Sequence, residues 1–194
     1  VETENLELEQ NQLKNAYDML DNKTRDALEQ SYQRIKVYQE NIKVKQESSQ
    51  QTECYERYHP IERVGIYVPG GKASYPSTVL MTATLAQVAG VNEITVVTPP
   101  QNNGICQEVL AACYITGVHH VYQVGGAQSI AALTYGTETI KKVDKIVGPG
   151  NQYVAYAKKF VFGQVGIDQI AGPTEIALII DESADLDAIA YDVF

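Results

Sequence analysis

Two amide side chains stand where an apolar run meets a glycine cluster and a helix is expected to begin. Gln128 follows Gly126, and Asn151 follows Gly150. The first N–H groups of a helix lack intrahelical partners and the helix dipole is positive there, so such a position attracts an anion such as a pyrophosphate. An amide in that first turn can donate to a ligand and accept from it. The alternative is that each amide only caps its helix.

Tyr67 lies near the end of the apolar run 64–68, where its ring can stack on a ligand or its hydroxyl can bind one. The chain has 13 tyrosines, so the residue type alone is weak evidence. The sequence contains neither the G-x-G-x-x-G nor the P-loop pattern. Thr98 ends the second run, where an Asp or Glu usually holds a nicotinamide ribose. The glycine clusters can therefore mark either a nucleotide-binding site or only tight turns between strands and helices. The standard Rossmann mode of nucleotide binding is disfavoured.

The cysteines and histidines form no recognisable reactive group. Cys106 and Cys113 lie seven residues apart in one expected helix, and we interpret them as small core residues rather than a redox pair. His119 and His120 are adjacent in an expected strand, where neighbouring side chains point to opposite faces and chelate a metal poorly. The sequence therefore predicts no catalytic residue and no metal ligand in this chain.

Four short apolar runs position these residues, and each run stops at a glycine or proline cluster. The runs are 64–68, 94–97, 121–124 and 145–147, and segments of helical periodicity lie between them. This alternation predicts a parallel sheet with helices on both faces, because a parallel crossover needs about a dozen residues. Ligands bind beyond the carboxyl ends of such strands. The expected fold is α/β with a Rossmann-like sheet and one ligand-binding rim at the four clusters.

The flanking segments predict further elements. Residues 4–20 and 23–48 are rich in Glu, Gln and Lys and lack glycine and proline, which predicts an N-terminal helical hairpin turning at Asp21-Asn22. A narrow apolar stripe on the second helix indicates that it rests on another element or on a dimer partner. The stripe comprises Leu28, Tyr32, Ile35, Tyr38 and Ile42. A last strand is expected at 175–181, followed by a helix after Ser183.

Composition argues against several partners. With a net charge of −9, the chain lacks the basic surface on which nucleic-acid binding depends. No apolar run approaches the roughly 20 residues that span a bilayer, and no secretory signal pattern is present. Three cysteines argue against a disulfide framework, so a reduced, cytoplasmic compartment is expected. The chain begins with Val1 and stops at Phe194 inside an unfinished apolar pattern, so we expect an internal piece of a longer protein.

Four stretches of the sequence resemble the histidinol dehydrogenase family. They are 64–71 (VGIYVPGG), 124–133 (VGGAQSIAAL), 142–151 (KVDKIVGPGN) and 167–175 (IDQIAGPTE). They follow the family's order, and the resemblance covers residues from about 60 to 194, with a looser match to the helices before them. Four long motifs in the same order make a chance similarity very improbable.

The resemblance implies a zinc-dependent, NAD-linked enzyme that oxidises L-histidinol through an aldehyde to L-histidine, the last steps of histidine biosynthesis. The family contacts NAD through a Tyr, a Gln and an Asn that match Tyr67, Gln128 and Asn151. Thr174 takes the place of a Ser that touches substrate in the family. The family's zinc ligands and its Glu-His acid/base pair are expected beyond Phe194. The segment alone is therefore expected to hold no zinc and to be inactive.

The resemblance also implies an intertwined homodimer in which the partner completes each active site. Residues 1–60 are then expected to be an N-terminal helical segment of the larger domain, 61–173 the Rossmann-like NAD-contacting domain, and 174–194 the start of the return into the larger domain. Two alternatives stay open. One is a non-catalytic nucleotide- or metabolite-binding module with the same fold. The other, which is weaker, is an aldehyde dehydrogenase-like enzyme with Cys106 or Cys113 as nucleophile.

Overall fold

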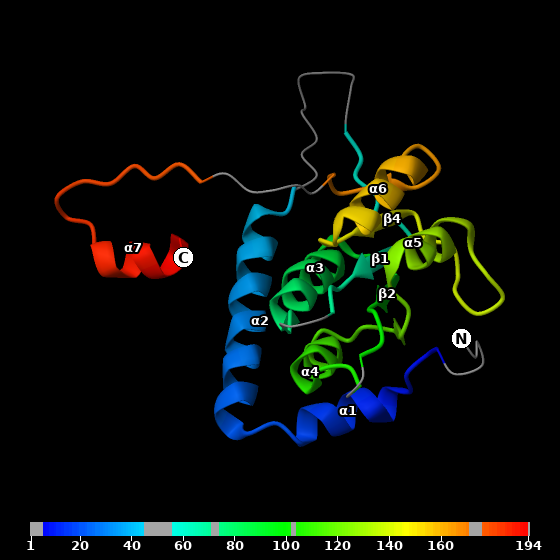
Figure 1. Ribbon diagram of the computed structural model, residues 1–194, viewed down its shortest axis with the longest axis horizontal. Helices are drawn as coiled ribbons and strands as arrows, with labels where there is room; N and C mark the ends of the chain where they lie inside the picture. Colours follow the sequence, from blue (N-terminus) through cyan, green and yellow to red (C-terminus); the bar gives the residue numbers. More distant parts are fainter. Residues whose placement is uncertain (1–5, 45–55, 71–73, 102–103, 171–175, 194) are drawn as a thin grey trace.

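A computed structural model describes residues 6–44, 56–70, 74–101, 104–170 and 176–193 (Figure 1). The elements of the first half are α1 (Gln10–Asp18), α2 (Asn22–Ile42), β1 (Arg63–Tyr67), α3 (Pro76–Ala89) and β2 (Glu93–Val97). Those of the second half are α4 (Gln107–Ile115), β3 (His120–Tyr122), α5 (Gly126–Tyr135), β4 (Lys145–Val147), α6 (Gln152–Val161), β5 (Gly166–Ile167) and α7 (Leu186–Val193).

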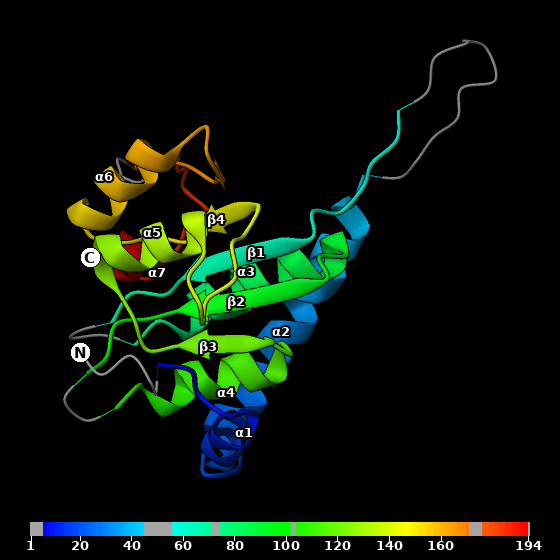
Figure 2. The ribbon, with the colours of Figure 1, turned by 90° about the vertical axis from the view of Figure 1, so that its right-hand side faces the viewer.

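The strands of the described residues form one parallel sheet in the order β3-β2-β1-β4-β5. Figure 2 labels the first four of these strands. β1 is central, since Gly65 pairs with Thr95 of β2 on one side and with Ile146 of β4 on the other. The chain moves outward from β1 through β2 to β3, and α5 then carries it back across to β4. This confirms the predicted α/β class. The strand order reverses between β1 and β4, the kind of point at which open α/β sheets bind ligands.

Helices cover both faces of the sheet (Figures 1 and 2). α3 and α4 pack on one face, with α1 against α4 and α2 against α3, whereas α5 and α6 pack side by side on the other face. Ile66 and Val96 belong to the core under α3 and α4, and Tyr67 and Val97 belong to the core under α5 and α6. Strands that are buried on both faces read as continuous apolar runs, which is the pattern of this sequence.

The N-terminal hairpin turns where the sequence predicts. Asp21 is the N-cap of α2, and its side chain accepts a hydrogen bond of 3.0 Å from the backbone N–H of Thr24. The apolar stripe of α2 rests on α3 through its first half, where Leu28 is buried. Tyr38 and Ile42, in the second half, are 61% and 55% exposed. The prediction that α2 rests on another element is therefore confirmed for its first half.

Two helix limits were predicted wrongly. Residues 6–9 are extended, and the segment pairs with the edge of the sheet at Tyr122. The N–H of Leu8 donates to the Val121 carbonyl (2.8 Å), and the N–H of Gln123 donates to the Leu6 carbonyl (2.7 Å). Leucines two residues apart suit a strand that buries one face, and this pairing outweighs the helix propensity of the neighbouring Glu and Gln. α2 ends at Ile42 rather than 48, although residues 45–48 lie outside the described part of the chain.

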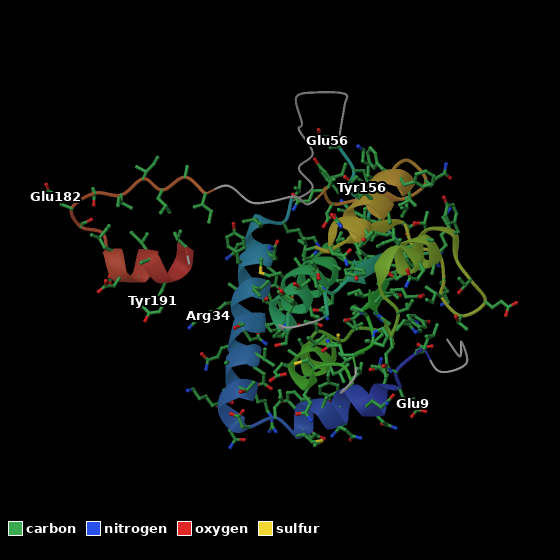
Figure 3. The ribbon with its side chains drawn as sticks, in the orientation of Figure 1. Glu9, Arg34, Glu56, Tyr156, Glu182 and Tyr191 are labelled. Atoms are coloured by element: carbon green, nitrogen blue, oxygen red, sulfur yellow. The ribbon has the colours of Figure 1, made fainter. Side chains whose placement is uncertain are left out.

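The C-terminal strand is a further correction. Residues 176–181 form no strand, and Ile179 is fully exposed, because in the described residues no neighbouring strand pairs with this apolar run. α7 follows, and Asp185 rather than Ser183 accepts the hydrogen bonds at its start, from the N–H groups of Asp187 and Ala188. Glu182 and Tyr191 lie away from the sheet (Figure 3). Within the described residues, no helix has the length and apolar character needed to cross a bilayer.

Candidate functional site

The turns that follow the first three strands touch one another at the carboxyl edge of the sheet. A Cβ atom on Gly125 would fall 2.5 Å from Cβ of Pro99, and one on Gly70 would fall 2.8 Å from Cγ of Pro99. Real Cβ contacts are not that short, so glycine is needed at both positions. The Pro99 ring therefore links the turn after β1 to the turn after β3.

The turn after β4 packs directly on the end of β1. Gly148 has a φ of +105°, and a Cβ atom there would lie 2.2 Å from the carbonyl oxygen of Tyr67. Glycine alone fits this contact, since both the backbone conformation and the space exclude a side chain. All four glycine and proline clusters thus lie along one edge of the sheet, which confirms their predicted convergence.

Tyr67 connects β1 to the start of α5. Its side chain is 3% exposed, and its hydroxyl oxygen accepts a hydrogen bond of 3.2 Å from the backbone N–H of Gly126. The tyrosine therefore satisfies one of the N–H groups that a helix start leaves unpaired. This burial disfavours the stacking role considered from the sequence, and it leaves the hydroxyl proton as the group that Tyr67 can offer a ligand.

Gln128 stands in the first turn of α5 and is exposed. Gly126 has a φ of +70°, and a Cβ atom on it would lie 2.8 Å from Oε1 of Gln128. The Gln128 amide therefore occupies the space beside Gly126, whose backbone N–H is bonded to the hydroxyl of Tyr67. The two predicted residues come from distant parts of the sequence, and the Gly126 backbone brings them to the same helix start.

Asn151 is the N-cap of α6. Its Oδ1 accepts a hydrogen bond of 3.1 Å from the N–H of Val154, so the capping role considered from the sequence is present. The side chain is exposed, and this cap does not use its amide nitrogen. Asn151 can cap α6 and donate to a ligand at the same time. The fourth predicted site residue, Thr174, lies outside the described residues.

Sequence reasoning missed an ion pair beneath this edge. Lys158 of α6 is 2% exposed, and its ammonium group contacts the Asp168 carboxylate and donates to the Gly148 carbonyl (2.9 Å). The other Asp168 oxygen accepts from the N–H of Gly148 (2.8 Å). Lys158 stands four residues after Val154 and three before Val161, which are both buried. That helical spacing was the signal that could have revealed a buried lysine.

Other reactive side chains of the described residues are separate from this edge. Cys113 is fully buried, and burial raises the pKa of its thiol to about 12, so it is a core residue as predicted. Cys106 precedes α4 rather than lying within it, and its thiol contacts Glu108. His120 contacts Glu7 through Nδ1 at 2.6 Å. No three His, Cys, Asp or Glu side chains of the described residues are grouped as metal ligands, so these residues do not fit zinc.

The edge does fit an anionic dinucleotide. The starts of α5 and α6 both follow strands that end here, and their N–H groups and dipoles favour a phosphate. Amides from both helix starts supply donors and acceptors, and the Gln128 amide fills the space that a side chain on Gly126 would need.

Known proteins resemble this chain both in sequence and in structure. The family model described as histidinol dehydrogenase matches residues 1–194. A histidinol dehydrogenase from Staphylococcus epidermidis is 98% identical over 194 residues, and one from Staphylococcus aureus is 77% identical over 193 residues. These matches cover 100% and 99% of this chain but 47% and 46% of the relatives, so the chain spans about half their length.

A solved structure agrees with the sequence comparison. The crystal structure of histidinol dehydrogenase from Elizabethkingia anophelis superposes with a TM-score of 0.91 at 36% identity, covering 98% of this chain and 45% of that one. The chain therefore belongs to the histidinol dehydrogenase family.

Proposed function

We propose that this chain is the NAD-binding part of a longer, zinc-dependent histidinol dehydrogenase, an enzyme that oxidises L-histidinol through the aldehyde to L-histidine in histidine biosynthesis. The main support for the proposal is that the Tyr67 hydroxyl and the Gln128 amide both lie against Gly126 at the start of α5. It lies on the carboxyl edge of a sheet whose strand order reverses between β1 and β4. NAD, when bound, supplies the acceptor for hydride from the substrate.

In this proposal the chain's own residues bind and orient the cofactor. The Tyr67 hydroxyl and the amides of Gln128 and Asn151 hydrogen-bond the cofactor, while the starts of α5 and α6 face its phosphates. Thr174 contacts substrate. The zinc ligands and the Glu-His acid/base pair are contributed from outside this chain, which on its own is inactive.

The organisation of the whole protein is also a proposal. Residues 1–60 and 174–194 belong to a larger domain, and residues 61–173 form the Rossmann-like domain. The enzyme is a cytoplasmic homodimer whose active sites are each completed by the partner subunit, and it binds neither nucleic acid nor membrane.

The test is NADH formation by a full-length protein that contains this chain, supplied with L-histidinol and NAD. We expect NADH absorbance to rise, a zinc chelator to abolish the rise, and added zinc to restore it. No NADH with zinc present, together with measurable NAD binding, would identify the non-catalytic nucleotide-binding module instead. Absence of both would contradict the proposal.

A further inference from the structure

Lys158 is an unusual residue to find in the core, since a lysine is almost never fully buried unless it is paired. Its side chain runs from α6 beneath the turn that joins β4 to α6 and donates to the Gly148 carbonyl at 2.9 Å. The ammonium group also contacts Oδ1 of Asp168. Asp168 follows β5, the neighbour of β4 in the sheet.

The pair holds both backbone polar groups of Gly148. Lys158 binds the Gly148 carbonyl, and Oδ2 of Asp168 accepts from the Gly148 N–H at 2.8 Å. The contacts form a closed ring that runs through the Gly148 peptide groups, the ammonium and the carboxylate. At the same time, the Gly148 backbone is pressed against the carbonyl of Tyr67, where a Cβ atom would be 2.2 Å away.

The Lys158 side chain is buried, whereas the Asp168 side chain is 31% exposed. Such an ion pair contributes little net stability compared with apolar residues of the same volume, because the cost of removing the ammonium group from water offsets its attraction to the carboxylate. The presence of the Lys158–Asp168 pair is therefore better explained by its hydrogen bonds to the backbone of Gly148. Asn151, three residues beyond Gly148, caps α6 and starts the helix that faces the proposed cofactor.

We propose that Lys158 and Asp168 are positioning residues, which fix the 148–151 turn so that Asn151 and the start of α6 meet the phosphate-bearing part of NAD. The inference rests on the proposed function, since it takes NAD as the ligand of this edge. Neither residue needs to touch the cofactor. They affect NAD binding indirectly, because the position of the Gly148 backbone determines where Asn151 lies.

The test compares Lys158→Met with Lys159→Met in a full-length protein that contains this chain. Lys159 is the next residue of α6 and is exposed, so it is a matched control for the loss of one positive charge on this helix. NAD binding is measured by calorimetry on chelator-treated protein, and KM and kcat are measured on the zinc-loaded enzyme.

For Lys158→Met we expect the Kd and KM for NAD to rise about tenfold, which corresponds to one well-placed hydrogen bond to a charged ligand. The kcat and the KM for histidinol should stay within about twofold, and Lys159→Met should match the unaltered protein. Unchanged NAD affinity in a folded Lys158→Met protein, or an equal loss in every parameter, would overturn the inference. If Lys158→Met does not fold, Asp168→Asn, which keeps the side chain's shape, is judged by the same criteria.

Gln128→Ala separates failure of this inference from failure of the proposed function. If Gln128→Ala weakens NAD binding but Lys158→Met does not, the positioning role is wrong and the NAD site stands. If NAD does not bind the unaltered protein, both fail.

Discussion

Asn151 has two proposed roles that one substitution can separate. In Asn151→Asp, a carboxylate oxygen can still accept from the Val154 N–H, and a negative charge at a helix start is favourable. The aspartate offers no amide donor and repels an anionic cofactor. We expect a melting temperature that is unchanged or raised, with the KM for NAD raised at least about tenfold. Asn151→Ala, which removes the cap as well, should also lose about 1 kcal/mol of stability. Normal NAD binding by Asn151→Asp would contradict the contact with the cofactor.

The buried thiol of Cys113 should make the stability of the protein depend on pH. Its pKa is raised from an ordinary 9.0 to about 12 by burial, so the folded protein keeps the thiol proton at a pH where the unfolded chain has lost it. The unfolded state then binds fewer protons, and the free energy of unfolding falls by about 1.4 kcal/mol per pH unit above pH 9. Urea unfolding should therefore show a steeper alkaline decline for the unaltered protein than for Cys113→Ala. Equal slopes would show that the thiol is not protected.

The turn from β4 to α6 requires glycine at position 148. Gly148→Ala must both hold a φ of +105° and displace the Tyr67 carbonyl, whereas Gly163→Ala, at a φ of +98°, meets no atom within 4 Å. We expect Gly163→Ala to cost about 1–2 kcal/mol from backbone strain and Gly148→Ala to cost clearly more. Chemical denaturation of both variants measures the difference. Equal costs would show that the Tyr67 contact is relaxed in solution.

The elements also show what a sequence can and cannot predict. The buried strands β1 and β2 and the helices that end at Gly90 and Gly136 follow from local patterns, because apolar runs and helix-stopping glycines act within a few residues. β5 was missed because a two-residue strand carries no periodicity of its own. The strand expected at 175–181 failed for the opposite reason, since its apolar pattern has no paired neighbour in the described residues.

For the candidate site, too, the sequence predicts local features but not contacts between distant residues. Gln128 and Asn151 were identified because helix starts after glycines are visible locally, and Tyr67 because the family resemblance singled it out. The contact between Tyr67 and Gly126 joins residues 59 positions apart and depends on the strand order. The Lys158–Asp168 pair likewise depends on β5 lying beside β4.

At the scale of the whole molecule, α6 presents a large apolar surface to solvent. Tyr153, Tyr156 and Phe160 are 65%, 69% and 85% exposed, and Tyr156 projects from this helix in Figure 3. Clustered exposed aromatics mark surfaces that are covered in a complete assembly. We expect the 194-residue chain alone to self-associate, as measured by size-exclusion chromatography with light scattering. We also expect it to bind a hydrophobic dye, as measured by the fluorescence of the dye. Phe160→Lys should reduce both effects, and a monodisperse monomer that binds no dye would contradict this expectation.

Calorimetric titration of NAD into a full-length protein that contains this chain measures whether the carboxyl edge of this sheet binds NAD. The titration is repeated with Gln128→Ala and with Gln107→Ala, which alters an exposed glutamine at the start of α4 on the opposite face of the sheet. We expect Gln128→Ala to raise the Kd for NAD about tenfold and Gln107→Ala to leave it unchanged. Equal affinities for all three proteins would contradict NAD binding at this edge.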